Sequence, residues 1–138
     1  MLVDTSVVLA YLSGGEPSSA DAEELFDGLV GTGRNAASVS AITVAEILVR
    51  PFRTSAAAVA IAEGFLRHFA DIRIVPVDYE VAREGARIRA STNLPMPDAL
   101  IVASARVADA NVLITSDRTW RKRVGDLAST MTILELPI

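Results

Sequence analysis

Four carboxylates occupy positions in this chain from which they could share one cation. Asp4 directly follows a short apolar run, and Asp117 comes just after another, VLIT. Asp98 lies in the first turn of an expected helix, and Glu46 lies about one turn into a different one. Two like charges about 4 Å apart repel by roughly 4 kcal/mol at an effective dielectric constant near 20. Such a cluster therefore requires either protonation or a metal ion.

A hard divalent cation suits this set of side chains. Mg²⁺ prefers oxygen ligands in octahedral geometry and keeps several waters, so a few carboxylates can hold it without histidine or cysteine. Bound in this way, Mg²⁺ polarises a phosphodiester, lowers the pKa of a water and stabilises the leaving oxygen. We therefore expect metal-dependent phosphoryl transfer, with the metal held by Asp4, Glu46, Asp98 and Asp117.

Each of these carboxylates also has a structural interpretation. An aspartate after a strand often caps the next helix, which fits Asp4 and Asp117, and Asp98 at a helix start fits the same role. Glu46 has mostly apolar neighbours within one helical turn, and a buried carboxylate should find a cation. Arg50, one turn later, could supply that cation in a salt bridge.

Strands and helices alternate along the chain, which predicts a five-stranded parallel α/β sheet covered by helices on both faces. The expected strands are 1–4, 35–40, 71–77, 111–115 and 131–136. The expected helices are 5–14, 17–33, 41–51, 55–70, 78–91, 97–110 and 116–127. Ligands of such sheets bind at the carboxyl ends of the strands, near the point where the strand order reverses. All four carboxylates could meet there.

Several residues mark where the helices should begin or end. Ser18 or Ser19 is expected to cap the second helix, with acidic residues in its first turn. Ser40 should cap the helix that carries Glu46, and Pro51 should bend or stop that helix. Pro97 fits the first position of its own helix.

Composition narrows the class of protein. The 138 residues are 51% hydrophobic, which suits one domain over 1–138. The chain has no cysteine, which excludes thiolate zinc sites, and its only histidine, His68, excludes a two-histidine mechanism. A net charge of −4 argues against general binding of polyanions through bulk charge. No apolar run approaches the ~18 residues of a membrane span, so we expect a cytoplasmic protein.

Four segments together resemble the signatures of a known family. They are VDTSVVLAYL at 3–12, SAITVAEIL at 40–48, PDALIVASA at 97–105 and LITSDRTW at 113–120. Their order and spacing are similar to those of the PIN-domain ribonucleases, and most similar to the VapC-type toxins of toxin–antitoxin pairs. Each segment alone is a weak signal, but all four in sequence are fairly specific, and the resemblance covers essentially the whole chain.

The resemblance implies a function and roles for particular residues. Such proteins are Mg²⁺- or Mn²⁺-dependent endoribonucleases, usually homodimers, neutralised by a small VapB-like antitoxin whose other half binds DNA. The resemblance implies that Asp4, Glu46 and Asp98 form an acidic triad, with Asp117 as a fourth acidic position and Ser6 and Thr115 lining the site.

RNA contacts could come from basic side chains near the site. The candidates are Arg50, Arg53, Arg118, Arg121, Lys122 and Arg123, and RTWRKR is the only basic cluster that contains an aromatic residue. A solvated helix surface is the alternative for each of them. His68 is expected to be structural, at a helix C-terminus. Tyr11, Phe26, Phe65 and Phe69 are expected in the core or on a dimer surface rather than stacked on bases.

Two other functions stay open at this point. A haloacid-dehalogenase-like phosphatase also uses Mg²⁺ at strand ends, but it needs a second aspartate two residues after the first, where this chain has Ser6. A non-catalytic module could keep the fold and bind an antitoxin or RNA without cleaving it.

Overall fold

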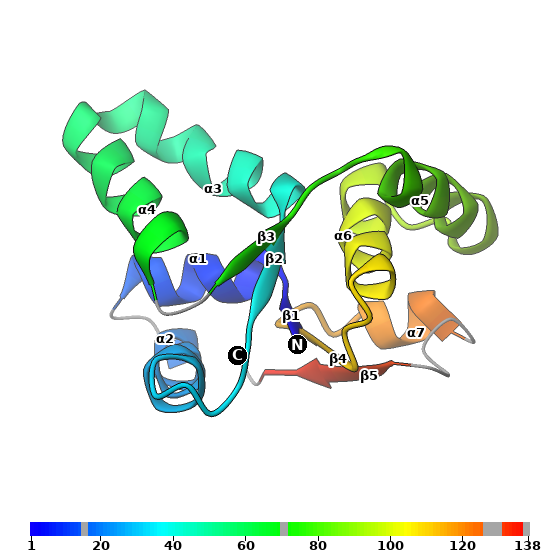
Figure 1. The fold of residues 1–138 in the computed structure, drawn as a ribbon, viewed down its shortest axis with the longest axis horizontal. Helices are drawn as coiled ribbons and strands as arrows, with labels where there is room; N and C mark the ends of the chain where they lie inside the picture. The colour runs from blue at the N-terminus through cyan, green and yellow to red at the C-terminus, as the bar shows by residue number, and fades with distance from the viewer. Residues whose placement is uncertain (15–16, 70–71, 126–130, 137–138) are drawn as a thin grey trace.

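A five-stranded parallel sheet forms the centre of the molecule (Figure 1). The computed structural model describes residues 1–14, 17–69, 72–125 and 131–136. The strands lie in the order β3-β2-β1-β4-β5, and every neighbouring pair is parallel. Their bounds are β1 Leu2–Val3, β2 Ser38–Ser40, β3 Arg73–Val75, β4 Val112–Thr115 and β5 Thr132–Glu135. The predicted sheet is confirmed.

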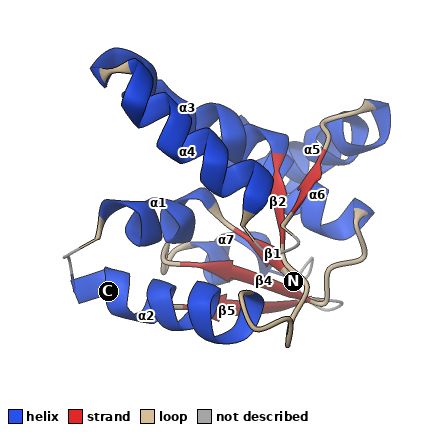
Figure 2. Ribbon diagram, turned by 60° about the vertical axis from the view of Figure 1, so that its left-hand side comes forward, coloured by secondary structure: helices blue, strands red, loops and turns tan. Residues whose placement is uncertain are grey.

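Helices cover both faces of this sheet, as Figure 2 shows. One side carries α1 Thr5–Ser13, α2 Pro17–Glu23, the π-helix η1 Glu24–Val30, α3 Ala41–Thr54 and α4 Ala56–His68. The other side carries α5 Tyr79–Thr92, α6 Met96–Val107 and α7 Trp120–Val124. No helix in the described part of the chain is long and apolar enough to cross a membrane.

Two apolar cores lie on the opposite faces of the sheet. Successive residues of a strand point to opposite faces, so Leu2 and Leu113 enter one core while Val3 and Ile114 enter the other. All four side chains are buried, which explains why consecutive residues of β1 and β4 are apolar at these positions. The strand ends are thereby fixed in place.

Most helices start at the residues that the sequence indicates. Asp4, Ser40, Ser55 and Asp78 each accept a hydrogen bond from a backbone N–H at the start of the following helix. The predicted cap at Ser40 is therefore confirmed. Such a cap satisfies one of the N–H groups that a helix start leaves without a partner.

Two of the predicted helix ends are wrong. The second helix already includes Pro17, so Ser18 and Ser19 lie inside it and do not cap it. Proline suits a first turn because its missing N–H has no acceptor there, which lets the helix begin earlier. Pro51 does not stop α3, which continues to Thr54. Pro51 has no N–H, so α3 lacks one i→i−4 hydrogen bond there, and the helix continues for three residues beyond it.

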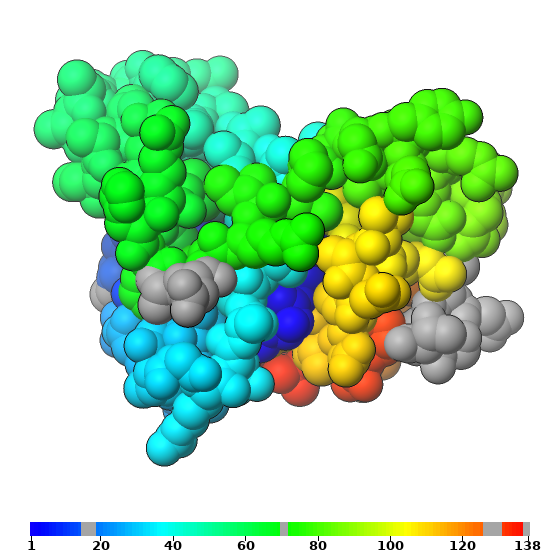
Figure 3. All heavy atoms as spheres, viewed as in Figure 1, coloured from blue at the N-terminus to red at the C-terminus, as the bar shows by residue number. Residues whose placement is uncertain are grey.

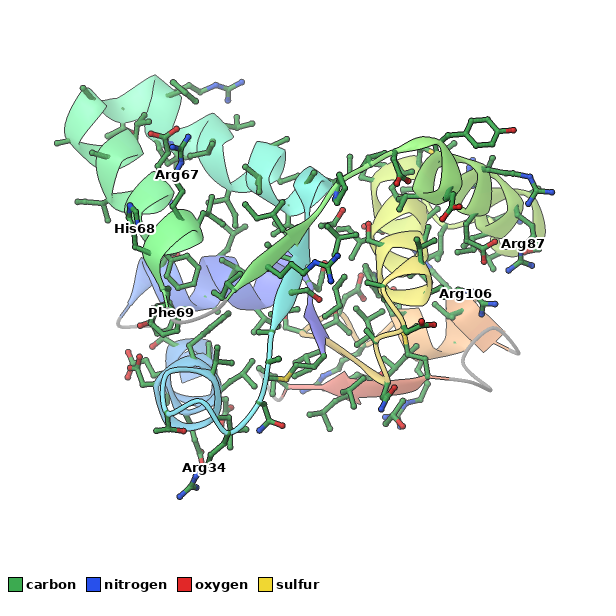
Figure 4. All side chains as sticks on the ribbon, in the orientation of Figure 1. Arg34, Arg67, His68, Phe69, Arg87 and Arg106 are labelled. Carbon is green, nitrogen blue, oxygen red and sulfur yellow. The ribbon has the colours of Figure 1, made fainter. Side chains whose placement is uncertain are left out.

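Four aromatic rings pack together between α1, η1 and α4. The ring centroids of Tyr11, Phe26, Phe65 and Phe69 lie 4.8 to 5.8 Å apart in every pairing. The expected packing role of these rings is confirmed. His68 ends α4, directly before Phe69, as Figure 4 shows.

Gly85 allows α5 to pack closely on α6. A methyl group there would lie 2.6 Å from Leu100 Cδ2, whereas one at Gly64 in α4 would meet nothing within 4 Å. We expect Gly64→Ala to stabilise the fold by about 0.5–1 kcal/mol through helix propensity. Gly85→Ala should be destabilising by about 1–2 kcal/mol because Leu100 must move. Urea unfolding measures both, and equal stabilisation by the two substitutions would contradict this packing.

Candidate active site

The candidate site lies where the strand order reverses, between β1 and β4. β2 and β3 follow on one side of β1, and β5 follows β4 on the other. Asp4 comes directly after β1, and its backbone N–H donates to the Ile114 carbonyl of β4 at 2.8 Å. This is the edge at which open α/β sheets bind their ligands.

Asp4 is held by three hydrogen bonds in a nearly buried position. Its Oδ1 accepts from the Thr5 N–H at 2.8 Å, and its Oδ2 accepts from Ser6 Oγ at 2.7 Å and Thr115 Oγ1 at 2.8 Å. Burial raises the pKa of Asp4, although these hydrogen bonds partly oppose the shift. Asp4 therefore both caps α1 and presents a fixed carboxylate at the strand end.

Ser6 and Thr115 connect this carboxylate to the loop after β4. Ser6 Oγ accepts from the Ser116 N–H at 3.1 Å, and Thr115 Oγ1 accepts from the Asp117 N–H at 3.0 Å. Each hydroxyl thus donates to Asp4 and accepts from the loop that carries Asp117. The two hydroxyls hold both aspartates in one hydrogen-bonded network.

Replacing Thr115 tests this network through its pH dependence. Thr115→Val removes a donor to a buried carboxylate, so we expect a loss of about 1–3 kcal/mol at pH 7.5. The folded pKa of Asp4 is already raised and should rise further. A carboxyl whose pKa is raised by folding costs stability as pH rises through the folded pKa. The loss should therefore be smaller at pH 4, measured by urea unfolding.

Thr43→Val is the matched control for this substitution. Thr43 is also fully buried, but its hydroxyl accepts from the neutral Thr5 Oγ1 at 3.0 Å. Its loss of stability should be the same at both pH values. A pH-independent loss in Thr115→Val would show that its hydroxyl does not support the Asp4 carboxylate.

Asp98 feels the charge of all three other carboxylates. It lies half-buried in the first turn of α6. Burial raises its pKa to about 6, with further contributions from Asp4, Glu46 and Asp117, while Arg123 acts in the opposite direction. Each of these three carboxylates is therefore near enough for its charge to act on Asp98.

Asp117 is held in the charged form. Burial alone would raise its pKa, but hydrogen bonds from Thr119 and the nearby Arg123 outweigh it, and the net pKa is lowered. The Thr119 N–H and Oγ1 donate to Asp117 Oδ1 at 2.8 and 2.7 Å. This turn precedes α7, so Asp117 is both a turn residue and a member of the acidic group.

Glu46 is exposed, so its predicted burial among apolar neighbours is wrong. The inner face of α3 is formed by Thr43 and Ile47, and Glu46 lies on a different face of the helix. Nor does Glu46 form a salt bridge with Arg50 within the described residues. Its charge nevertheless acts on Asp98, so α3 brings Glu46 within electrostatic reach of that carboxyl.

Two buried pairs of hydroxyl groups position the helices of the site, and neither pair was predicted from the sequence. Ser104 Oγ of α6 donates to Ser40 Oγ at 2.9 Å, and Thr5 Oγ1 of α1 donates to Thr43 Oγ1 of α3. These bonds join the elements that carry Asp4, Glu46 and Asp98. Ser104, a polar residue within the apolar sequence of α6, was the one indication in the sequence of a buried hydrogen bond there.

The candidate RNA-binding residues have different surroundings. Arg121 Nη2 donates to the Ile133 carbonyl of β5 at 2.9 Å. Arg50 lines an apolar hollow of about 530 Å³ between α1, α3 and α4. Arg118 and Lys122 are exposed. Arg123 is the basic residue whose charge lowers the pKa of both Asp98 and Asp117.

The carboxylates do not form a ready-made metal site. Among the described residues, no three acidic or histidine side chains lie as close together as the ligands of one ion. The chemistry of the set still fits a hard divalent cation, because every donor is a carboxylate oxygen. The negative charges that act on Asp98 would also be offset by a bound cation. Exposed Glu46 is free to move towards such an ion, whereas Asp4 is fixed.

The surface is open near these helices. Figure 3 shows a broad notch between α3 and α4 on one side and α5 on the other. α3 carries Glu46, and α6, which packs against α5, carries Asp98. An open notch suits a chain-like substrate better than an enclosed pocket would.

A family model decides the identity of this fold. The model described as the PIN domain matches residues 1–125. The chain belongs to the PIN-domain family. A haloacid-dehalogenase-like phosphatase is thereby set aside. Among curated proteins, none matches this PIN domain in sequence.

Solved structures share the fold at low sequence identity. A chain of a toxin–antitoxin complex from Klebsiella pneumoniae is 19% identical, with a TM-score of 0.74, and the match covers 99% of this PIN domain and 97% of that chain. A chain of VapBC2 from Rickettsia felis, bound to a DNA fragment from their promoter, is 14% identical with a TM-score of 0.69. That match covers 99% of this PIN domain and 98% of the VapBC2 chain. A chain of FitAcB from Neisseria gonorrhoeae is 20% identical with a TM-score of 0.68, and the match covers 97% of this PIN domain and 96% of that chain.

Proposed function

We propose that this PIN domain is a Mg²⁺- or Mn²⁺-dependent endoribonuclease. The observation that supports the proposal is the raised pKa of Asp98, which results first from burial and then from the charges of Asp4, Glu46 and Asp117. Asp4, Glu46, Asp98 and Asp117 would hold the cation. When bound, the cation supplies a Lewis acid for a phosphodiester and a water of lowered pKa.

The side chains of the site have separate roles in this proposal. Asp4 is fixed by Ser6 and Thr115, so it keeps its position when substrate arrives. Asp98, whose pKa is raised to about 6 by burial and by the charges of Asp4, Glu46 and Asp117, is the carboxyl that gains most from a neighbouring cation. Exposed Glu46 can adjust to the ligand because its carboxylate forms no salt bridge within the described residues.

We also propose that the protein is the toxin of a type II toxin–antitoxin pair. Several structures with this fold are toxin–antitoxin complexes, and one VapBC complex was bound to DNA from its promoter. The expected partner is a VapB-like, DNA-binding antitoxin, and a cytoplasmic homodimer is the expected form. We assign the domain to the whole of 1–138, because β5 pairs with β4 beyond the matched 1–125.

The test uses the purified protein and total cellular RNA. The protein is incubated with Mg²⁺ or Mn²⁺, or with EDTA, and new RNA ends are mapped across the transcriptome. Discrete ends that require the metal would support the endoribonuclease and identify its substrate. Identical maps with metal and EDTA would favour the non-catalytic module that binds an antitoxin or RNA.

A further inference from the structure

The short helix α7 carries three consecutive basic residues, and the fold sends them in different directions. Trp120 and Val124 of this helix are each only 1% exposed and belong to the same apolar core as α6 and β5. These two anchors fix the rotation of α7 about its axis. Arg121, Lys122 and Arg123 must therefore leave the helix at set angles, about 100° apart.

Arg121 is turned away from the acidic group. Its Nη2 donates to the Ile133 carbonyl at 2.9 Å, and its Nε lies 3.9 Å from Glu135 Oε1, both on β5. This side chain links α7 to the edge strand. It is already engaged with the protein and is poorly placed to bind a substrate.

Arg123 leaves α7 about 200° from Arg121. Its backbone N–H donates at 3.0 Å to the carbonyl of Thr119, the residue whose N–H and hydroxyl hold Asp117, so Arg123 lies one helical turn from that turn. Its charge acts on both Asp98, at the start of α6, and Asp117, before α7. Arg123 is nevertheless exposed, and within the described residues its side chain forms no ion pair or hydrogen bond. Its guanidinium is thus beside the site with its donors available.

An acidic site needs such a cation if its substrate is RNA. The chain has a net charge of −4, and Asp98 already experiences the negative charges of Asp4, Glu46 and Asp117, so a phosphate that approaches Asp98 is repelled. A guanidinium offers a planar pair of donors that matches two phosphate oxygens, which also orients the group that it binds. Lys122, between Arg121 and Arg123, carries a single ammonium group that does not offer this paired geometry.

We propose that Arg123 binds a backbone phosphate of the RNA substrate next to the acidic group and holds it against Asp98 and Asp117. This inference rests on the proposed endoribonuclease function for its substrate class. Of the basic residues of α7, Arg123 is thus expected to bind phosphate, and Arg121, which contacts β5, is not.

The test separates RNA binding from cleavage. Asp98→Asn provides a background in which bound RNA is not cut, and the probe is a fluorescein-labelled, mixed-sequence single-stranded RNA of about 20 nucleotides. Adding Arg123→Gln should weaken binding about tenfold at low salt. It should also reduce the slope of log Kd against log salt by about 0.7, the value for one phosphate contact on a single strand.

Two further variants make this result specific. Arg34→Gln removes the same charge from an exposed loop before β2, at the amino end of the sheet, where Figure 4 labels it, and should leave both values unchanged. Arg123→Lys keeps the charge and loses the paired donors, so it should restore the salt slope but only part of the affinity. If Arg123 had only a structural role, Arg123→Lys would not restore the salt slope while leaving the affinity reduced.

The outcomes distinguish this inference from the proposed function. Equal binding by the Arg123→Gln and Arg34→Gln proteins would overturn the assignment of Arg123, and so would a background protein that does not bind the probe at all. A wild-type protein that leaves RNA intact while Arg123→Gln still loses one phosphate contact would refute the endoribonuclease alone.

Discussion

Asp98→Asn is expected to reduce metal-dependent RNA cleavage by about 10²- to 10³-fold, the size of loss found when one electrostatic stabiliser of a transition state is removed. Asp98 lies at the centre of the acidic group, because its pKa responds to Asp4, Glu46 and Asp117 together. Asparagine keeps the size of the side chain but removes the negative charge with which Asp98 would hold the cation. Initial rates of cleavage with Mn²⁺ measure the effect.

Asp78→Asn is the matched control for this prediction. Asp78 caps α5 by accepting from the Val81 N–H at 3.0 Å, and asparagine caps a helix equally well. The control should therefore keep wild-type cleavage and stability. If Asp98→Asn cleaves RNA as fast as Asp78→Asn does, Asp98 has no part in the chemistry.

Mn²⁺ is expected to stabilise the wild-type protein strongly. A ligand at about 100 times its Kd adds about 2.7 kcal/mol to the free energy of unfolding, which for a chain of this size raises Tm by about 8–10 °C. Two carboxylates of the site, Asp4 and Asp98, have raised pKa values, so the metal-free protein carries unfavourable charge that a cation relieves. Thermal unfolding with Mn²⁺ and with EDTA measures the shift.

The double variant Asp4→Asn/Asp98→Asn tests where the cation binds. It should lose nearly all of the Mn²⁺ response, whereas Asp78→Asn should keep it. In EDTA, wild type should also become more stable between pH 7.5 and pH 5, because Asp98 has a folded pKa of about 6 and regains its proton there. Solvent screening limits this gain to about 1 kcal/mol. An equal Mn²⁺ response in the double variant would place the cation elsewhere.

The strand ends of the site were predictable because the pattern of the central strands is unambiguous. Leu2, Val3, Leu113 and Ile114 are apolar on both faces, which only a sheet covered on both sides explains. Parallel strands bring their carboxyl ends to one edge, so the positions of Asp4 and Asp117 followed from sequence alone.

The orientation of α3 was not predictable in the same way. Its inner face contains the polar Thr43, while Val49 and Phe52 are 49% and 70% exposed, so hydropathy assigns the faces of this helix wrongly. Thr43 is accommodated inside because Thr5 donates to its hydroxyl. A partner so distant in the chain leaves no local signal, and Glu46 was misplaced for that reason.

The hydroxyl network around Asp4 was predicted only in part. The resemblance placed Ser6 and Thr115 at the site, but it did not show that both donate to the same carboxylate oxygen. That arrangement depends on β1 and β4 being neighbours, although they lie more than 100 residues apart in sequence. Strand order supplies the information that spacing along the chain does not contain.

The most direct test of the account is the chemistry of the new RNA ends. If the acidic group directs water at the phosphodiester, cleavage in H₂¹⁸O with Mn²⁺ should place one ¹⁸O atom on a linear phosphate at each cut. Mass spectrometry of the products detects this mass, and Asp98→Asn should give almost no labelled product. Ends that carry a 2′,3′-cyclic phosphate without ¹⁸O would mean attack by the ribose 2′-hydroxyl, and would contradict a metal-dependent hydrolytic site.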